Sequence, residues 1–349
     1  MLARASTLLA EEPTPEKLIL EGHWKRARTV VERRLRETPE DANSNFLWSQ
    51  ICNALGDRTS PPGLAEKALR LDGSVARYHR QVAEVQGVMA QRSNVFQQVG
   101  QARRFRKEIE TALELDPRDV QARRDLVEFY LVAPGILGGD AKKAEVEVQQ
   151  IAAIDRAEGF LAQARIAELR KDYVRAGALL HGAAALRPPS YRALMALADF
   201  SLASAHRDEA AAEAAARAAL AIDAGRAGAY SILASIYAGR PVWAELEAVL
   251  TAAAKEVPDD LAPYYRAAER LIRDGRDPAR SERYLRIYLT QETEGNEPTL
   301  ADARWQLGLA LRAQGQEASA LAEWKAAVRL DPDSPAAREL KRSGKPAAN

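Results

Sequence analysis

The stretch ADARWQLGLALRAQGQEASALAEWKAAVRLDP, residues 301–332, decides the fold of this chain. Two amphipathic segments flank Gly315, and the second one ends just before Pro332. Gly308 in the first segment permits close approach of a second helix, and a large side chain such as Trp324 fills the remaining space. Because proline lacks the N–H that a helix interior needs, Pro332 stops the second segment. The stretch therefore predicts a pair of antiparallel helices.

The same frame of small and large residues recurs upstream at a spacing of about 34 residues in most of the chain. Second helices end in matching phrases, which are ALRLD at 68–72, ALELD at 112–116 and ALAID at 219–223. Nine helix pairs are predicted, starting near residues 8, 42, 76, 120, 157, 192, 227, 261 and 301, and a short helix over 335–341 follows. One pair cannot bury its apolar stripe alone, so the pairs must stack on one another.

This frame resembles the tetratricopeptide repeat (TPR) consensus of W-x2-L-G-x2-Y, then A-x3-F, then P. The matching residues of the last unit are Leu307, Gly308, Leu311, Ala320, Trp324 and Pro332. The unit departs at the leading aromatic position, where Arg304 stands and Trp305 follows. The resemblance covers almost the whole chain and is weaker over 1–60 and 189–224. A bacterial-type TPR protein implies an all-α, right-handed solenoid of about nine antiparallel helix pairs, whose first helices line the concave side.

The predicted organisation is one repeat domain with two tails. Residues 1–12 are expected to form a poorly ordered tail, residues 13–341 the solenoid, and 342–349 a disordered tail. Two segments break the rhythm: 86–101 reads as polar helix that lengthens the third unit, and the glycine-rich 133–140 replaces the turn inside the fourth. Since Asp140 suits a helix N-cap and no Gly-Lys-Ser/Thr follows, the glycine-rich segment is expected to be a structural turn rather than an anion site.

Composition argues against several classes of function. Lys plus Arg total 50 and Asp plus Glu total 49, so the basic excess of a nucleic-acid-binding protein is missing. The single cysteine, Cys52, excludes an internal disulfide framework and lies in an apolar helical run, where we expect it to be buried. No stretch approaches 18 apolar residues, so no transmembrane segment is predicted. The sequence as it stands indicates a cytoplasmic protein, or a periplasmic one if translation starts upstream with a signal peptide.

Catalytic motifs are missing from the sequence. G-x-S-x-G, H-E-x-x-H and C-x-x-C do not occur, and none of the four histidines has a second His or Cys one helical turn away. Acid pairs such as Asp259–Asp260 stand at helix starts, where caps and helix dipoles explain them. We therefore expect no enzyme activity, no cofactor and no metal site.

Candidate binding residues come from the first helices of the last two units. In the eighth unit they are Tyr265, Arg266, Arg270 and Arg273, and in the ninth they are Trp305, Gln306, Leu309 and Arg312. The three arginines form one stripe with spacing i, i+4, i+7, and such like charges repel unless something compensates. An acidic segment of a partner is one counterpart, and the neighbouring Glu269 and Asp274 are the other. For Trp305, the alternative to groove contact is packing between the eighth and ninth units.

These observations favour a scaffold or adaptor that binds a peptide or protein segment in the concave groove. The identity of the partner does not follow from the sequence. A structural array that orders a larger envelope or secretion assembly is the alternative, and the regulatory part of an enzyme is a third reading that the missing motifs disfavour.

Overall fold

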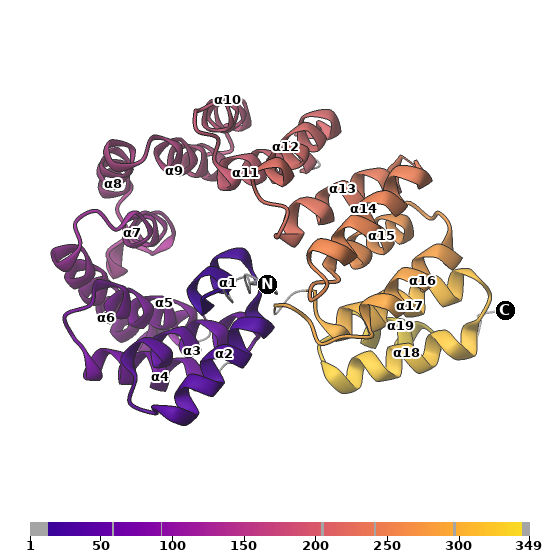
Figure 1. Ribbon diagram of the computed structural model, residues 1–349, viewed down its shortest axis with the longest axis horizontal. Coiled ribbons are helices and arrows are strands. Elements are labelled where there is room, and N and C mark those ends of the chain that lie inside the picture. Colours follow the sequence, from indigo (N-terminus) through magenta and orange to yellow (C-terminus); the bar gives the residue numbers. More distant parts are fainter. Residues whose placement is uncertain are drawn as a thin grey trace, which may run out of the picture.

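The computed structural model describes residues 13–57, 59–91, 93–203, 206–240, 242–295 and 298–343. The predicted tail over 1–12 lies outside the described residues, as does most of the predicted C-terminal tail. Within the described residues the chain is helical and contains no strand (Figure 1), which confirms the predicted all-α fold class.

Nine antiparallel pairs and a final helix account for the described residues. The elements are α1 (Pro15–Glu21) and α2 (Trp24–Glu37), α3 (Ala42–Ala54) and α4 (Ser60–Leu71), α5 (Ala76–Ala90) and α6 (Val95–Leu115), α7 (Val120–Val132) and α8 (Ala141–Ile154), α9 (Arg156–Leu169) and α10 (Tyr173–Ala184), α11 (Tyr191–Leu202) and α12 (Glu209–Ile222), α13 (Ala227–Gly239) and α14 (Trp243–Glu256), α15 (Ala262–Arg273) and α16 (Pro278–Tyr288), α17 (Leu300–Ala313) and α18 (Glu317–Leu330), and α19 (Ala336–Ser343). A short 3-10 turn, η1 (Gly135–Leu137), separates α7 from α8. The last helix runs two residues beyond the predicted end of the solenoid at 341.

The recurring Leu/Ile-Asp phrase has a local structural role. In four units the aspartate follows the last residue of the second helix, adopts an extended backbone, and accepts a hydrogen bond from the main-chain N–H two residues later. The four examples are Asp72 with Ser74 (3.0 Å), Asp116 with Arg118 (3.0 Å), Asp223 with Gly225 (2.9 Å) and Asp331 with Asp333 (3.0 Å). Asparagine and aspartate favour turns because their side chains bond to the nearby backbone in this way. The phrase therefore ends one repeat unit and orients the chain toward the next.

Packing within a unit follows the predicted match of small and large residues. Trp324 of α18 is fully buried, and its indole lies directly against Gly308 of α17. A Cβ added at Gly308 would come within 2.1 Å of the Trp324 ring nitrogen, so only glycine permits this approach. Cys52 is buried as predicted, and burial raises the pKa of its thiol to about 11.

The two irregular segments differ in how they fold. Residues 86–101 were predicted to be polar helix that lengthens the third unit; the structure has helix on both sides of a break between α5 and α6, where Asn94 caps the new helix by accepting from Gln97 N. The glycine-rich segment is a turn, as predicted: Asp140 caps α8, and Gly138 has a φ of +106°. At Gly139 a Cβ would meet the Ala133 carbonyl oxygen at 1.8 Å. Close backbone contact therefore requires the glycine-rich sequence.

The nine units curve into a ring (Figure 1). The first unit lies beside the late units, and α1 lies near the middle of the view. Hydrogen bonds join residues of the first unit to residues between 259 and 294, more than 230 positions away in the sequence. In the part of the chain that the structure describes, no helix is long and apolar enough to cross a membrane.

Candidate binding surfaces of the ring

Three of the eight predicted binding residues lie in the interior. Tyr265 is 3% exposed, and its ring centroid lies 5.3 Å from that of Tyr288. Arg270 is buried and pairs with Asp274 at 2.7 Å and with Glu209 at 3.1 Å. Gln306 is also buried. The expectation that these side chains line an accessible groove is therefore corrected: first-helix residues also fill the seams between neighbouring units.

The arginine stripe has intramolecular counterparts. In addition to the pairs of Arg270, Arg266 lies 3.1 Å from Glu269, and Arg273 lies 3.9 Å from Asp274. Arg273 is the most accessible of the three, with 54% of its side chain exposed. The neighbouring carboxylates thus offset the repulsion within the stripe, which was one of the two predicted explanations. Contact with an acidic partner is not needed to account for it.

The ninth unit retains accessible candidates. Leu309 and Arg312 line an open pocket of about 710 Å³ together with Ile272 of the eighth unit. Arg312 also pairs with Glu339 of α19 at 2.9 Å. Trp305 is half-buried and packs against the main core, and its carbonyl oxygen accepts a hydrogen bond from Trp324 Nε1 at 3.1 Å. Trp305 therefore combines partial core packing with partial exposure.

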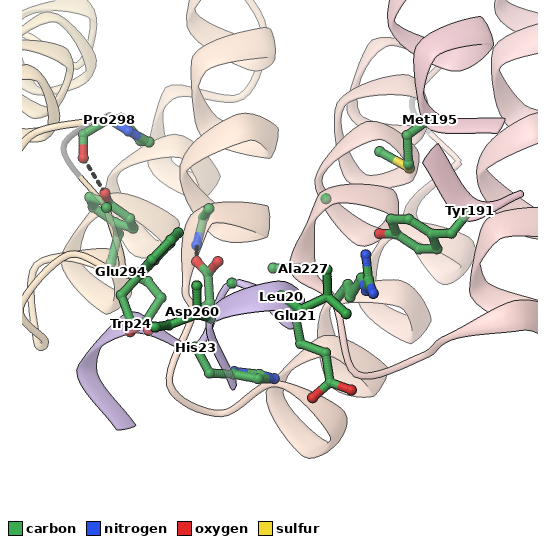
Figure 2. Close-up of a pocket in the computed structure, with 17 residues that line it drawn as sticks. Leu20, Glu21, His23, Trp24, Tyr191, Met195, Ala227, Asp260, Glu294 and Pro298 are labelled. Atoms are coloured by element: carbon green, nitrogen blue, oxygen red, sulfur yellow. Dashed lines mark hydrogen bonds between the residues drawn. The ribbon is translucent and has the colours of Figure 1, made fainter. Parts of the chain in front are cut away.

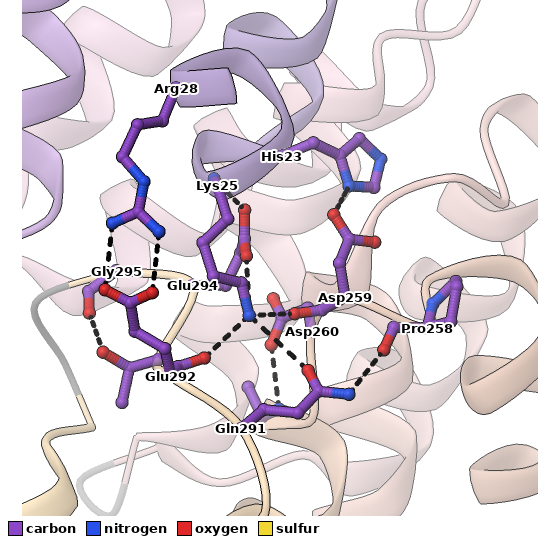
Figure 3. A network of polar contacts seen from close by, with 12 residues as sticks. His23, Lys25, Arg28, Pro258, Asp259, Asp260, Gln291, Glu292, Glu294 and Gly295 are labelled. Atoms are coloured by element: carbon purple, nitrogen blue, oxygen red, sulfur yellow. Dashed lines mark hydrogen bonds and ion pairs between the residues drawn. The ribbon is translucent and has the colours of Figure 1, made fainter. Parts of the chain in front are cut away.

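A polar network joins the first unit to the segments on either side of the eighth helix pair (Figure 3). His23 Nδ1 lies 2.8 Å from Asp259 Oδ2. Lys25 Nζ donates to the carbonyl oxygens of Asp259 and Glu292, both at 2.7 Å, and lies 3.1 Å from Glu294 Oε2. The Lys25 main-chain N–H donates to the other Glu294 oxygen at 2.9 Å. The start of α2 is thus bound to the segment before α15 and to the connector before α17.

Arg28 completes this junction with a two-pronged ion pair. Its Nη1 and Nη2 atoms donate to the two carboxylate oxygens of Glu292 at 2.9 and 2.7 Å (Figure 3). Such bidentate pairs are among the stronger and more directional ion pairs in proteins. The hydrogen bond from Arg28 lowers the pKa of Glu292, so this carboxylate keeps its charge over a wide pH range.

The junction shifts the pKa of its histidine in a defined direction. The hydrogen bond to Asp259 raises the pKa of His23, although burial and the nearby Arg26 act against it. Burial works to raise the pKa of Asp259, but the hydrogen bond and charge of His23 lower it overall. Both shifts favour the charged pair, in which the imidazolium contacts the carboxylate.

A pocket of about 460 Å³ lies beside the junction. Figure 2 shows Leu20 and Glu21 of α1 between two walls, with Tyr191 and Met195 on one side and Asp260 and Glu294 on the other. Trp24, Tyr288 and Arg226 also line it. The Arg226 guanidinium lies 4.5 Å from the centre of the Tyr191 ring. We call this space the closure pocket.

Neither the closure pocket nor its junction was predicted from the sequence. No motif singles out His23, and Asp259–Asp260 were predicted to be helix caps. Asp260 does cap, since its Oδ1 accepts from Ala262 N at 2.8 Å, but Asp259 contacts His23 instead. The available signals were the lengthened connector before α17, with Glu292 and Glu294, and the basic start of α2. Nothing in a single sequence pairs two such segments.

Solved structures that are similar to this chain include helical-repeat proteins, whereas no protein-family model and no curated protein matches the sequence. One is the thermophilic TPR protein TTC0263 of Thermus thermophilus, with 18% identity over 54% of this chain and 96% of that chain and a TM-score of 0.47. A TPR protein of Parabacteroides merdae ATCC 43184 has 17% identity over 74% and 97%, with a TM-score of 0.46. Pseudomonas aeruginosa pilF has 16% identity over 74% and 98%, with a TM-score of 0.41.

Proposed function

We propose that this TPR-type chain is a protein-binding scaffold, and that a segment of a partner protein binds at the closure pocket of the ring. The observation that carries the proposal is the lining of that pocket. Aromatic side chains, methionine and arginine are the types enriched at protein interfaces, and here Trp24, Tyr191, Met195 and Arg226 meet around one hollow. A pocket of this size is within the range that holds a ligand or an anchoring side chain.

The charges around the closure pocket define what it would accept. Glu21, Asp260 and Glu294 line it beside a single arginine, Arg226. Burial raises the pKa of Asp260 and also that of Glu294, which Lys25 opposes. We infer that the pocket accepts a mainly apolar side chain and that the surrounding carboxylates contact polar atoms of the bound segment. Arg273, with 54% of its side chain exposed, remains a candidate contact for an acidic segment.

Affinity purification from the native organism, with mass spectrometry, tests the proposal. The wild-type chain is compared with Met195→Asp, which places a charge among the apolar lining, and with the matched control Val174→Asp, an exposed apolar residue of α10. We expect a stoichiometric protein that is lost from Met195→Asp and retained by Val174→Asp. Equal recovery on all three chains would contradict the closure pocket as the binding site. Self-association without any partner would favour the structural-array alternative.

A further inference from the structure

The two segments that break the repeat rhythm meet at one hollow. A pocket of about 430 Å³ lies between α5, α6 and α7, and the turn that includes η1 forms one side of it. Its apolar lining includes Phe105 and Phe129, whose ring centroids are 5.1 Å apart. Gly138, at the end of η1, lies against the Phe129 ring. We call this hollow the third-unit pocket; it is separate from the closure pocket.

The polar lining of the third-unit pocket is acidic. Glu84, Asp125 and Glu128 contribute carboxylates, and no lysine or arginine is among the described residues that line it. Asp125 Oδ2 and Gln101 Oε1 are buried and accept no hydrogen bond from any described residue. Glu84 receives one long hydrogen bond, from Asn53 at 3.4 Å. Buried acceptors without donors are costly, so the pocket favours a ligand that brings N–H groups.

Most of the nearby arginines pair with other carboxylates. Arg80 of α5 has the largest charge effect on the pKa values of both Glu84 and Asp125; its Nε lies 3.4 Å from Asp119, but its Nε and Nη1 donate no hydrogen bond to any described residue. On the other side of Asp125, three arginines line a smaller hollow. Arg165 pairs bidentately with Glu128, while Arg124 and Arg192 each lie 3.3 Å from Glu158. Neither Asp125 nor Glu84 accepts a hydrogen bond from a lysine or arginine of the described chain.

Exposed apolar side chains lie on the elements that form the pocket. Val132, which lines the pocket, is 62% exposed. Ile136 stands between the lining residues Pro134 and Leu137 and is 94% exposed, and Met89, next to Val88 and Ala90, is also exposed. Apolar residues exposed around a hollow are typical of a contact surface for another molecule. Exposed apolar side chains outside the hollow favour a protein segment over a small amine, which would contact the hollow alone.

We propose that the third-unit pocket is a docking site for a partner-protein segment in which a lysine or arginine side chain is flanked by apolar residues. The cation enters the hollow, where its N–H groups donate to Asp125, Glu84 and Gln101. The flanking apolar residues cover Val132, Ile136 and Met89. An anionic segment is disfavoured, because it would bring a like charge to Asp125 and Glu84, which accept no hydrogen bond from a described lysine or arginine.

Selection from a phage-displayed library of random peptides, with the full chain as bait at pH 8, tests this proposal. Selected peptides are synthesised and their affinities measured by fluorescence polarisation. We expect the selected peptides to compete with one another and to carry a basic residue between apolar residues. Their affinity for Asp125→Asn should be about tenfold or more weaker than for the wild-type chain. The matched control Glu114→Gln removes an exposed carboxylate of α6 outside the pocket and should leave the affinity unchanged. Circular dichroism melting confirms that each variant is folded.

Other outcomes would overturn the proposal. It fails if no selected peptide loses affinity for the Val132→Glu variant. It also fails if the peptides that do lose affinity contain no basic residue, or if they bind Asp125→Asn as tightly as wild type. Peptides that are sensitive only to Met195→Asp would overturn it while supporting binding at the closure pocket. Failure here and failure of the proposed function are thus distinguishable.

Binding at the third-unit pocket should also depend on pH. Burial raises the pKa of Asp125 to about 7, with Glu84 and Asp119 acting in the same direction and Arg80 and Arg124 opposing it. A cationic ligand favours the ionised carboxylate, so affinity should rise as the pH increases through about 7 and weaken below it. Asp125→Asn should abolish this dependence. An equal pH profile for wild type and Asp125→Asn would contradict the assignment of Asp125 as the contacting group.

Discussion

Gly308 and Trp324 control the distance between α17 and α18. The indole occupies the space that any other residue at position 308 would fill, and its Nε1 donates to the Trp305 carbonyl oxygen one turn before Gly308. A single glycine therefore sets both the helix spacing and the hydrogen bond of a buried tryptophan. Elsewhere in the chain, a glycine with open space around it, such as Gly63 in α4, has no such role.

We predict opposite effects of the same substitution at these two glycines. Gly308→Ala should lower the free energy of unfolding by about 1–3 kcal/mol, because the added methyl group overpacks the Trp324 contact. Gly63→Ala should raise it by about 0.5–1 kcal/mol, since alanine is the better helix former. Chemical denaturation measures both values. Stabilisation by Gly308→Ala would show that α17 and α18 are not in this close contact.

Substitutions at Trp305 and Arg273 distinguish a residue that packs in the core from one that is accessible to a partner. Because its side chain is half-buried against the core, Trp305→Ala should lower the free energy of unfolding by about 2 kcal/mol. Arg273→Ala, which removes an exposed side chain, should change it by less than about 0.5 kcal/mol. Thermal and urea unfolding measure the difference. If Trp305→Ala leaves stability unchanged and weakens partner binding, the residue belongs to the groove as first predicted.

The glycine-rich turn between α7 and α8 is the element that shapes the third-unit pocket. It replaces a short intra-pair turn, and its η1 segment brings Leu137 and Gly138 toward Phe129. The backbone passes so close to itself that Gly139 has no room for a side chain. The added residues therefore build a wall of the pocket instead of forming a loose loop.

Substitution within the turn should distinguish a wall from a loose loop. Gly139→Ala should destabilise the chain by roughly 2 kcal/mol and speed amide hydrogen exchange over 133–140, since a Cβ would meet the Ala133 carbonyl. Gly135→Ala is the control, because nothing lies within 4 Å of its added methyl group. Equal exchange rates in the two variants would be inconsistent with the turn described here.

The ring depends on contacts between the first unit and the segments on either side of the eighth helix pair. Neighbouring units stack whether or not these segments meet, so closure rests on the junction of His23, Lys25 and Arg28 with residues 259–294. Charged hydrogen bonds of this kind are directional but lose strength in salt when they are exposed. The whole-molecule shape should therefore be more sensitive to pH and ionic strength than the helices are.

We predict that the ring is more uniformly closed at pH 6 than at pH 8.5. The pKa of His23 is raised in the closed form, so its contribution is complete below the usual histidine pKa and is lost as the pH rises through the raised value. Because the pKa of Asp259 is lowered, this carboxylate loses its charge, and with it its contribution to closure, only at acidic pH. Spin labels at Thr29→Cys and Ala254→Cys, both exposed, report the distance distribution by double electron–electron resonance. Cys52 is buried and stays unlabelled.

The control for this measurement is His23→Gln, which cannot gain a proton. Its distance distribution should be the same at both pH values, and broader than that of the wild type at pH 6. A wild-type distribution that narrows at pH 8.5 would contradict the sign of the effect. Raising the salt concentration should broaden the distribution in every variant, because the Arg28–Glu292 pair is partly exposed.

The sequence by itself determined the repeat architecture and most of its boundaries. Helix pairs, the Gly308–Trp324 contact, the turn at 133–140 and the burial of Cys52 all depend on residues within one unit or its neighbour. Such local dependence is why a solenoid can be recognised from its sequence. Repeat units pack mainly on their neighbours, so the same small, large and capping residues recur at the same positions of each unit.

Only the tertiary structure decided which surfaces are accessible. Tyr265, Arg270 and Gln306 occupy first-helix positions, yet they lie in seams between units, because small rotations per unit determine which side of a helix stays open. The contact of His23 with Asp259 depends on the summed curvature of all the units between them. That sum has no signature at either end of the chain, so the closure pocket becomes visible only when the whole ring is assembled.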